Sequence, residues 1–380
     1  MSAIYEIQIY NSSLEKLGEL QGWEYLEFTQ RVNSPWNHAI TIKTSPNSSY
    51  AAFIRDSDGM QDWIFLVYRT DPILGIRHLA YEGFNRTIVD QLDNHGDVIF
   101  NFYGVGFTEL LTRRIVVPPR NYESLEITNY AESAMKQFVR SQCIAPEDTD
   151  RIITGLTNEP DNSSGSVVTY SARYTILNTV VDKCAVDGDV DYGIVGADPA
   201  EGEEIGTFEF QVRPLWGLDR TRGNSDGNPV TIFDVTLGNM AIPIYSVNSS
   251  GEKNAVYVGG QGQGVNRAIY YDSNTTAIAM SPWNRREDFA DARLESTTAG
   301  LATTAQEILE NYKTKRSLTF NVIQTTGYRW VRNWNLGDLI TAKYYEIEQT
   351  QQITQISSRI SGRGGGQTEV IGVEFEAQDT

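Results

Sequence analysis

Apolar side chains recur at every second position through the first 118 residues, and this spacing constrains the fold more than any other feature of the chain. The alternating positions are Tyr5, Ile7 and Ile9; Ile40 and Ile42; Trp63, Phe65 and Val67; and Val98, Phe100 and Phe102. Turn-forming clusters such as NSPWN, SPNSS, RDSDG and LDNHGD separate these segments. Short alternating segments with frequent turns predict an antiparallel barrel or sandwich over residues 1–118. The stretch VVPPRNYES closes the region, because paired prolines cannot continue a central strand.

Residues 119–225 follow a different pattern, with helical spacing at two places. In LEITNYAESAMKQFVRSQC, apolar residues recur at the 3.6-residue period from Ile127 to Phe138. A second helix is indicated by Tyr174, Leu177, Val181 and Cys184. YGIVGA and GTFEFQVRP are typical of strands and flank the acidic loop DPAEGEE. The pattern predicts a small α+β domain over 119–225.

Residues 226–316 combine further strands with a predicted pair of helices. VTIFDV, NAVYVGG and RAIYY are strand-like, and residues 226–262 are a candidate completion of the first barrel. REDFADAR and LATTAQEILENY are predicted to be helical, the first of them a solvated or interface helix with ion pairs between Arg285 and Asp288 or between Asp288 and Arg293.

The last segment, 317–380, alternates again and predicts a second barrel, with SGRGGGQTE as a flexible hairpin tip. The expected fold class is therefore mixed α+β, β-rich and multidomain. It consists of two tube-type antiparallel β-barrel domains plus smaller α+β domains.

The charge of the chain limits its partners. It carries 49 Asp and Glu against 31 Lys and Arg, a net charge of −18. Tight binding to duplex DNA depends on cationic side chains that release counterions, so such a surface is not expected, although DNA could slide past without adhering. No run of 18 apolar residues occurs, and we expect no insertion into a membrane. The only cysteines, Cys143 and Cys184, are predicted to be buried thiols of a protein folded in a reducing cytoplasm.

The glycine-rich stretch VGGQGQGVNR (258–267) resembles a phosphate-binding loop only superficially. Gly260 and Gly262 have the first spacing of a dinucleotide-binding fingerprint, but the third position is Val265. The residues that follow favour a strand, so no helix N-terminus is available for a pyrophosphate. A tight, bulged connection between strands is the better interpretation.

Signals for catalysis and metal binding are absent from the sequence. His38, His78 and His95 are isolated, and there is no Gly-x-Ser-x-Gly elbow. DGDVDYG (187–193) has Tyr192 where a calcium loop needs glycine, and is predicted to be a solvated acidic turn. Carboxylate pairs remain possible among so many acidic residues. We predict a protein that is not an enzyme, with no catalytic, cofactor-binding or metal-binding residues and no cofactor.

Four stretches in order resemble the hub proteins of siphophage tails, which share a fold with the central baseplate hub of contractile-tailed phages. They are FEFQVRPLWGLDRT (208–221), NAVYVGGQGQGVNRA (254–268), RREDFADAR (285–293) and WNLGDLITAKY (334–344). QRVNSPWNHAITIKTS (30–45) is similar to the opening barrel of the same family.

The resemblance implies a structural protein of the virion. It implies a homotrimer in which two barrels per subunit form a pseudo-sixfold ring at the distal end of the tail tube. Its implied partners are the tail tube, distal tail proteins, tail-tip or fibre proteins and the tape measure protein, and DNA passes through the lumen without specific binding. A host-surface or carbohydrate-binding tail module is the alternative, and a cell-wall hydrolase is the third hypothesis.

Overall fold

The computed structural model describes residues 3–11, 15–56, 62–196, 207–293, 295–325, 327–362 and 368–377. The chain forms two compact units. Unit 1 consists of Met1–Ile242 together with Phe320–Thr380, and unit 2 is Pro243–Thr319.

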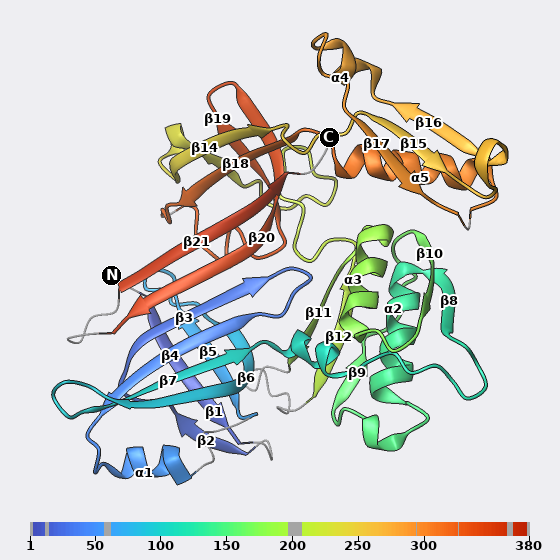
Figure 1. Cartoon of the computed structure of the whole chain (residues 1–380). Helices are drawn as coiled ribbons and strands as arrows, with labels where there is room; N and C mark the ends of the chain where they lie inside the picture. The colour runs from blue at the N-terminus through green and yellow to red at the C-terminus, as the bar shows by residue number, and fades with distance from the viewer. Residues whose placement is uncertain are drawn as a thin grey trace. The chain divides into compact units, whose positions relative to one another are not determined.

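Unit 1 is built around one eleven-stranded sheet (Figure 1). Its strands are β1 (Ile4–Tyr10), β2 (Lys16–Glu19), β3 (Trp23–Arg31), β4 (Asn37–Thr44), β5 (Ile64–Thr70), β6 (Arg77–Leu92), β7 (Val98–Val105), β13 (Ile232–Asp234), β19 (Leu339–Tyr344), β20 (Ile347–Ser361) and β21 (Thr368–Ala377). The order is β13-β19-β20-β3-β4-β7-β6-β5-β1-β2, and β21 pairs with β20. The two ends of the chain therefore share one sheet, joined where β20 pairs with β3.

The alternation in the sequence places the core of this sheet. Phe100 and Phe102 on β7 and Ile40 on β4 have no exposed surface. β5 departs from alternation because both of its faces are buried: Phe65 and Val67 point one way, while the other face packs into the cluster formed with the helices of residues 119–225. A strand that is covered on both faces has a continuous run of apolar residues in its sequence.

The predicted mixed α+β, β-rich fold is confirmed. Among the described residues no sheet closes into a barrel, so the two tube-type barrels remain a prediction. Residues 226–262 contribute β13, which pairs with β19, and β15, which belongs to unit 2.

Residues 119–225 fold largely as expected. The two helices are α2 (Ala131–Val139) and α3 (Leu177–Gly188), and they pack on each other (Figure 1). The strands around them are β8 (Leu125–Tyr130), β9 (Leu156–Asn158), β10 (Val167–Ala172), β11 (Asp191–Gly196) and β12 (Phe208–Arg213). The first helix begins four residues later than Ile127, because that residue lies in β8 and pairs with Tyr170 of β10. The predicted loop DPAEGEE lies outside the described residues.

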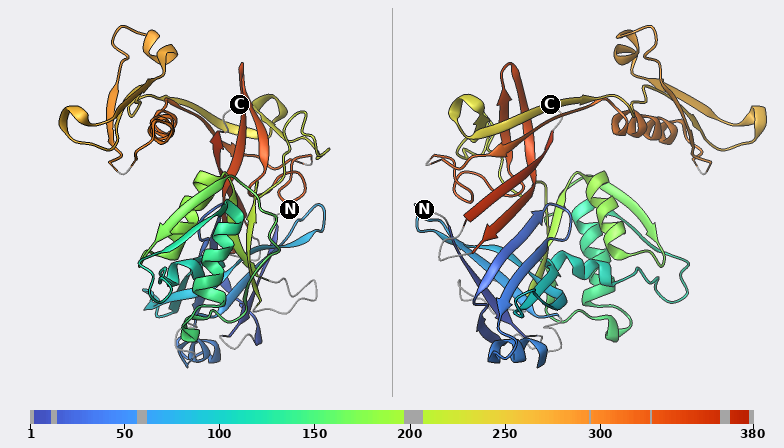
Figure 2. Two further views of the ribbon diagram at one scale, coloured as in Figure 1. Left: turned by 90° about the vertical axis from the view of Figure 1, so that its right-hand side faces the viewer. Right: turned by 60° about the vertical axis from the view of Figure 1, so that its left-hand side comes forward.

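Unit 2 is a small sheet with one helix against it (Figure 2). Its elements are β15 (Ala255–Gly259), β16 (Ile269–Ser273), α4 (Thr275–Ala279), β17 (Glu287–Asp291) and α5 (Thr298–Asn311). The prediction of α5 is confirmed, with Leu301 and Ala305 packed on Val256 and Val258. The prediction of a helix at REDFADAR is wrong, because these residues form β17, parallel to β15, with Ala290 packed against the same core.

The described residues also contain one more α-helix, two more strands and several short 3-10 or π helices, which are Phe107–Arg113, Arg140–Ile144, Thr149–Arg151, Val235–Leu237 and Gly264–Asn266. α1 (Ser49–Asp56) is a helix that the sequence analysis did not anticipate. β14 (Met240–Asn248) and β18 (Lys315–Val322) pair with each other. The predicted hairpin tip SGRGGGQTE joins β20 to β21, and its residues 363–367 lie outside the described residues.

Candidate functional site

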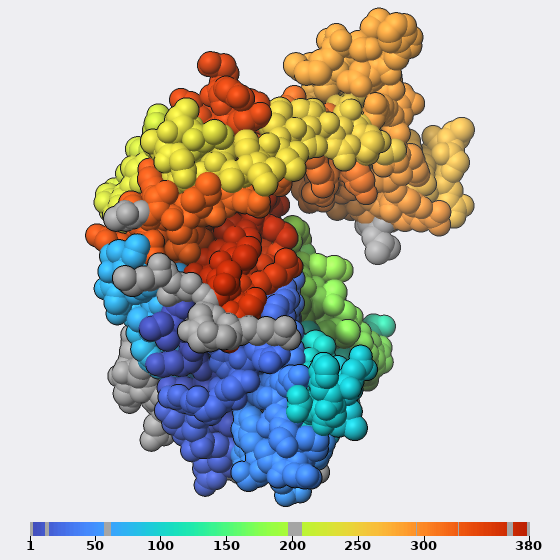
Figure 3. Space-filling model, turned by 90° about the vertical axis from the view of Figure 1, so that its left-hand side faces the viewer, coloured from blue at the N-terminus to red at the C-terminus, as the bar shows by residue number. Residues whose placement is uncertain are grey.

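A groove of about 890 Å³ follows β21 in unit 1. It is lined by Ala3, Arg69, Pro72 and Ile73, by residues 321–324 with Arg329, by Gln355, Ser357 and Arg359 of β20, and by residues 368–374 of β21. In the space-filling view, the red surface of β20 and β21 is recessed between the orange C-terminal segment and the blue N-terminal strands (Figure 3).

β21 presents its edge to this groove. Seven consecutive residues of the strand line it, whereas one face of a strand would supply only every second residue. The inner edge of β21 is paired with β20. No described strand pairs with the outer edge. That edge therefore offers backbone N–H and C=O groups over a length of ~23 Å.

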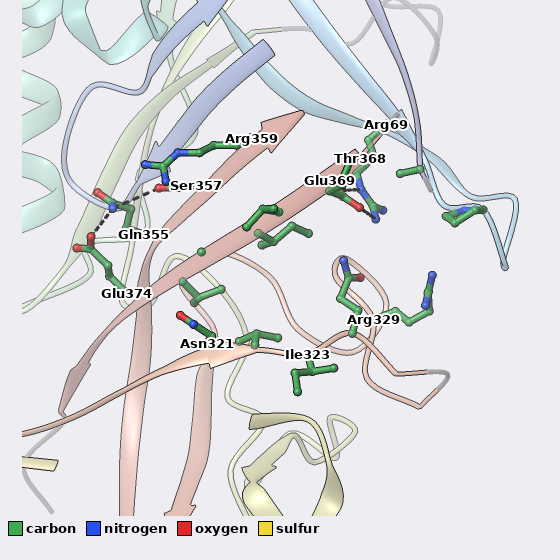
Figure 4. A pocket seen from close by; sticks show the side chains of 18 of the residues that line it. Arg69, Asn321, Ile323, Arg329, Gln355, Ser357, Arg359, Thr368, Glu369 and Glu374 are labelled. Carbon is green, nitrogen blue, oxygen red and sulfur yellow. Dashed lines mark hydrogen bonds and ion pairs between the residues drawn. The ribbon is translucent and has the colours of Figure 1, made fainter. Parts of the chain in front are cut away.

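The walls of the groove combine polar and apolar side chains. Ile73, Ile323 and Val370 line it and are 57%, 43% and 60% exposed. On the floor, Gln355 donates a hydrogen bond to Glu374 at 2.6 Å, which ties β20 to β21 (Figure 4). Large apolar side chains beside a free strand edge are typical of a surface that another protein segment covers.

A buried ion pair connects the beginning of β21 to β5 and β1. Arg69 of β5 is 1% exposed and donates from Nε to Glu369 Oε1 at 2.7 Å and from Nη2 to Oε2 at 3.1 Å (Figure 4). The hydroxyl of Tyr5, on β1, donates to the same carboxylate. Burial and the Glu369 charge raise the pKa of Tyr5, so its hydroxyl stays a donor. We call Tyr5, Arg69 and Glu369 the β21 clamp.

A second ion pair continues from the clamp. Arg329 donates to Asp71 Oδ2 at 2.8 Å, and the N–H groups of Ile73 and Leu74 donate to Asp71 Oδ1. Burial alone would raise the pKa of Asp71, but these hydrogen bonds and the Arg329 charge hold it below its ordinary value. Arg69 Cζ also lies 5.3 Å from the centre of the Trp330 ring. The two arginines and the two carboxylates compensate one another's charge inside the unit.

A further buried carboxylate joins three segments of unit 1. Asp191 accepts hydrogen bonds from Asn33 Nδ2, Gln352 Nε2 and the Trp216 N–H at 2.7 to 2.9 Å. Asn33 in turn accepts from the N–H of Tyr192. The predicted solvated acidic turn at 187–193 is therefore wrong for Asp191, which is 8% exposed and whose pKa is raised by burial.

The stretches that resemble tail hubs meet in pairs. Asp338 of WNLGDLITAKY accepts from Arg220 Nε at 2.6 Å and from the Leu218 N–H at 2.7 Å, both in FEFQVRPLWGLDRT. In unit 2, β15 of NAVYVGGQGQGVNRA pairs with β17 of RREDFADAR. The four stretches thus form two pairs whose members are in contact in the structure.

The glycine-rich loop also has a packing role. A Cβ on Gly259 would lie 2.6 Å from Arg267 Cζ, and Arg267 donates to the carbonyl oxygens of Gly259 and Gly260. Arg267 pairs with Asp291, and Arg285 pairs with Glu287 at 2.7 Å, instead of the predicted pairs to Asp288. The loop is a β15–β16 connection that makes room for an arginine.

The histidines are dispersed, as the sequence indicated. His38 is buried, His78 lies against Trp330, and His95 is exposed in a turn. Burial lowers the pKa of His38 to about 3, and burial with the Arg69 charge lowers that of His78 to about 4. Within the described ranges no group of three His, Cys, Asp or Glu side chains is arranged to hold a metal ion. No helix in that part of the chain is long and apolar enough to span a membrane.

The sequence matches the model of the siphovirus ReqiPepy6 Gp37-like protein family over residues 6–372. The chain belongs to this family. The predicted resemblance to siphophage tail proteins is confirmed at this level. No curated protein matches the chain by sequence.

Solved structures with a similar fold include tail proteins and a chain of a PdpA–VgrG complex. A tail protein from Neisseria meningitidis MC58 is 12% identical, with a TM-score of 0.57, over 97% of this chain and 96% of that one. The 43 kDa tail protein of prophage MuSo2 from Shewanella oneidensis is 13% identical, with a TM-score of 0.57, over 97% and 98%. A chain of the Francisella PdpA–VgrG complex is 12% identical, with a TM-score of 0.55, over 99% of this chain and 58% of that one. At these identities the likeness is one of fold.

Proposed function

We propose that this chain is the structural hub of a siphophage tail. Three copies form a pseudo-sixfold ring at the distal end of the tail tube and join the tube to the tail tip. Family membership and a fold shared with two tail proteins along almost their whole length support this role. The protein is made in the host cytoplasm and resides in the virion. It has no catalytic function.

The observation that carries the ring is the outer edge of β21, with which no strand of the described residues pairs. Exposed strand edges pair readily with other strands unless charge, proline or a cover protects them. Here the edge is flanked by Ile73, Ile323 and Val370 and is fixed near its start by the clamp at Glu369. A second copy of the chain is the occupant we assign to this groove.

The clamp also supports the barrel that the ring requires. The sheet runs from β21 through β20, β3, β4, β7, β6 and β5 to β1, and Glu369 on β21 bonds to Arg69 on β5 and Tyr5 on β1. Side-chain hydrogen bonds thus connect β21, at one end of this path, to β5 and β1 at the other. We propose that residues 1–118 build most of one tube-type barrel, which β20 and β21 complete, and that residues 317–380 also contribute to the second barrel.

The lumen would serve the passage of DNA. A net charge of −18 repels the phosphate backbone, so the genome can move through without binding. The proposed neighbours are the tail tube, the distal tail proteins, the tip or fibre proteins and the tape measure protein.

Light scattering tests the assembly. The wild-type protein should have a mass of about 128 kDa, three times that of the 42.6 kDa chain. Val370→Asp places a charge at the β21 edge and should give the monomer mass. Val167→Asp is the matched control, because Val167 also lies on a strand and is 61% exposed, and it should remain a trimer. A wild-type monomer in the presence of tube and tip proteins would contradict the proposal.

A further inference from the structure

The open face of the unit 2 sheet carries a row of aromatic side chains. Tyr257 of β15 lies directly opposite Tyr271 of β16 and Phe289 of β17. α5 lies against one face of this sheet (Figure 2). The intervening residues Val256 and Val258 pack against α5, so the alternation of a strand puts the row on the other face. Tyr271 is 42% and Phe289 53% exposed. Polar residues are expected at the solvent-facing positions of a sheet, and three aromatic rings there mark a contact surface.

Two arginines bracket this row. Arg285 donates to the hydroxyl of Tyr271 at 3.0 Å and to that of Tyr257 at 3.4 Å. At the other side, Arg267 lies 5.5 Å from the ring centre of Phe289. The centres of the two tyrosine rings are 4.8 Å apart, so the arginines border a short line of adjacent rings.

The charge of the site is balanced. Arg285 pairs with Glu287, and Asp291 pairs with both Arg267 and Arg293. Residues 243–319 contain eight Lys and Arg against eight Asp and Glu, although the whole chain has 31 against 49. Single-stranded nucleic acid also stacks on aromatic rings, but its binding surfaces carry excess positive charge. A ligand without net charge fits these residues better.

The size of the face further limits the ligand. Three strands ~4.8 Å apart and five residues long give an area of ~240 Å². A stable protein interface covers ~800 Å² on each partner. The row itself spans ~10 Å, which suits a small extended ligand.

We propose that this face binds an uncharged oligosaccharide of about three sugar units. Sugar rings have an apolar face of C–H groups that stacks on aromatic rings, and hydroxyl groups at the rim that pair with arginine and carboxylate. Tyr257, Tyr271 and Phe289 supply the platform, while Arg285 with Glu287 and Arg267 with Asp291 contact the hydroxyls. This site does not depend on the proposed ring.

The test is binding of the full-length protein to an array of uncharged tri- to hexasaccharides, followed by calorimetry with the strongest. Tyr257→Ala and Phe289→Ala should each weaken binding at least about fivefold. Tyr257→Phe keeps the stacking surface and should change affinity less than about threefold. Tyr312→Ala is the control, since Tyr312 is 48% exposed and follows α5, and it should bind as wild type. Circular dichroism and the melting temperature establish that each variant is folded.

Several results would overturn the proposal. They are the absence of binding to every uncharged glycan, binding that survives Tyr257→Ala in a folded protein, and binding restricted to charged glycans. Saturable binding of a dT15 oligonucleotide that is lost in Phe289→Ala would assign the face to nucleic acid instead. A change of oligomeric mass in Phe289→Ala would assign it to a second copy of the chain.

Discussion

Acidification should destabilise unit 1 through His38. His38 is only 3% exposed, and its Nδ1 is hydrogen-bonded to the hydroxyl of Tyr81 at 2.9 Å. It stacks near Phe65, and a Cβ on Gly104 would lie only 2.2 Å from its Cε1, so the ring is enclosed. When the imidazole is doubly protonated, its Nε2–H group finds no hydrogen-bond acceptor among the described residues.

The pH dependence of stability follows from the difference between the folded and unfolded pKa values of His38. The folded pKa of about 3 lies below the ordinary unfolded value of about 6.5, so the unfolded state binds the proton more readily. Stability that is present above pH 6.5 is lost as the pH falls toward 3. Between pH 7 and pH 5, His38 alone should remove about 2 kcal/mol from the free energy of unfolding. His78, with a pKa of about 4, acts in the same direction.

The assay is urea unfolding followed by tryptophan fluorescence at pH 7 and pH 5. His38→Asn keeps a polar partner for Tyr81 and cannot titrate, so its loss between the two pH values should be smaller than the wild-type loss by about 2 kcal/mol. His95→Asn, at an exposed turn, should lose as much as wild type. An equal loss in wild type and His38→Asn would refute the reasoning.

Three other substitutions test the contacts that organise the chain. Arg69 pairs with Glu369 and also lies 3.6 Å (Nη1 to Oδ2) from Asp71. Arg69→Met removes both contacts and should lower the free energy of unfolding in urea by about 3–5 kcal/mol, part of which returns when Glu369→Leu is added; an unchanged midpoint would contradict a stabilising role of the β21 clamp. Asn33→Gly retains the backbone angle at φ 56° but removes the bonds to Asp191 and Tyr192, and should cost about 1–3 kcal/mol, with faster amide exchange in β11. Gly259→Ala should displace Arg267 and speed exchange in β15 and β16, whereas Gly251→Ala, with open space around its Cβ, should not; equal exchange in both would argue against the packing role of the loop.

Local patterns in the sequence predicted much of the fold. Alternation identified the buried residues of β1, β4 and β7, and the 3.6-residue period identified α2, α3 and α5. The REDFADAR prediction was wrong because its charges suggested a helix, while pairing with β15 and burial of Ala290 decided the structure. Tertiary contacts commonly override so short a pattern.

The candidate sites depended on contacts that a single sequence does not reveal. Arg69 and Glu369 are 300 residues apart, and neither belongs to a recognisable motif. Asp191 was interpreted as solvated because it lies in the acidic stretch DGDVDYG, but in the structure Asn33, Gln352 and the Trp216 N–H enclose it. The aromatic row of unit 2 requires the register of three strands, one of which was predicted to be a helix.

Electron cryo-microscopy of the purified protein tests the central claim most directly. The hub proposal predicts particles of three copies around an open channel, with the outer edge of β21 and Val370 at each boundary between subunits. Monomeric particles, or rings in which the β21 groove faces solvent, would contradict it.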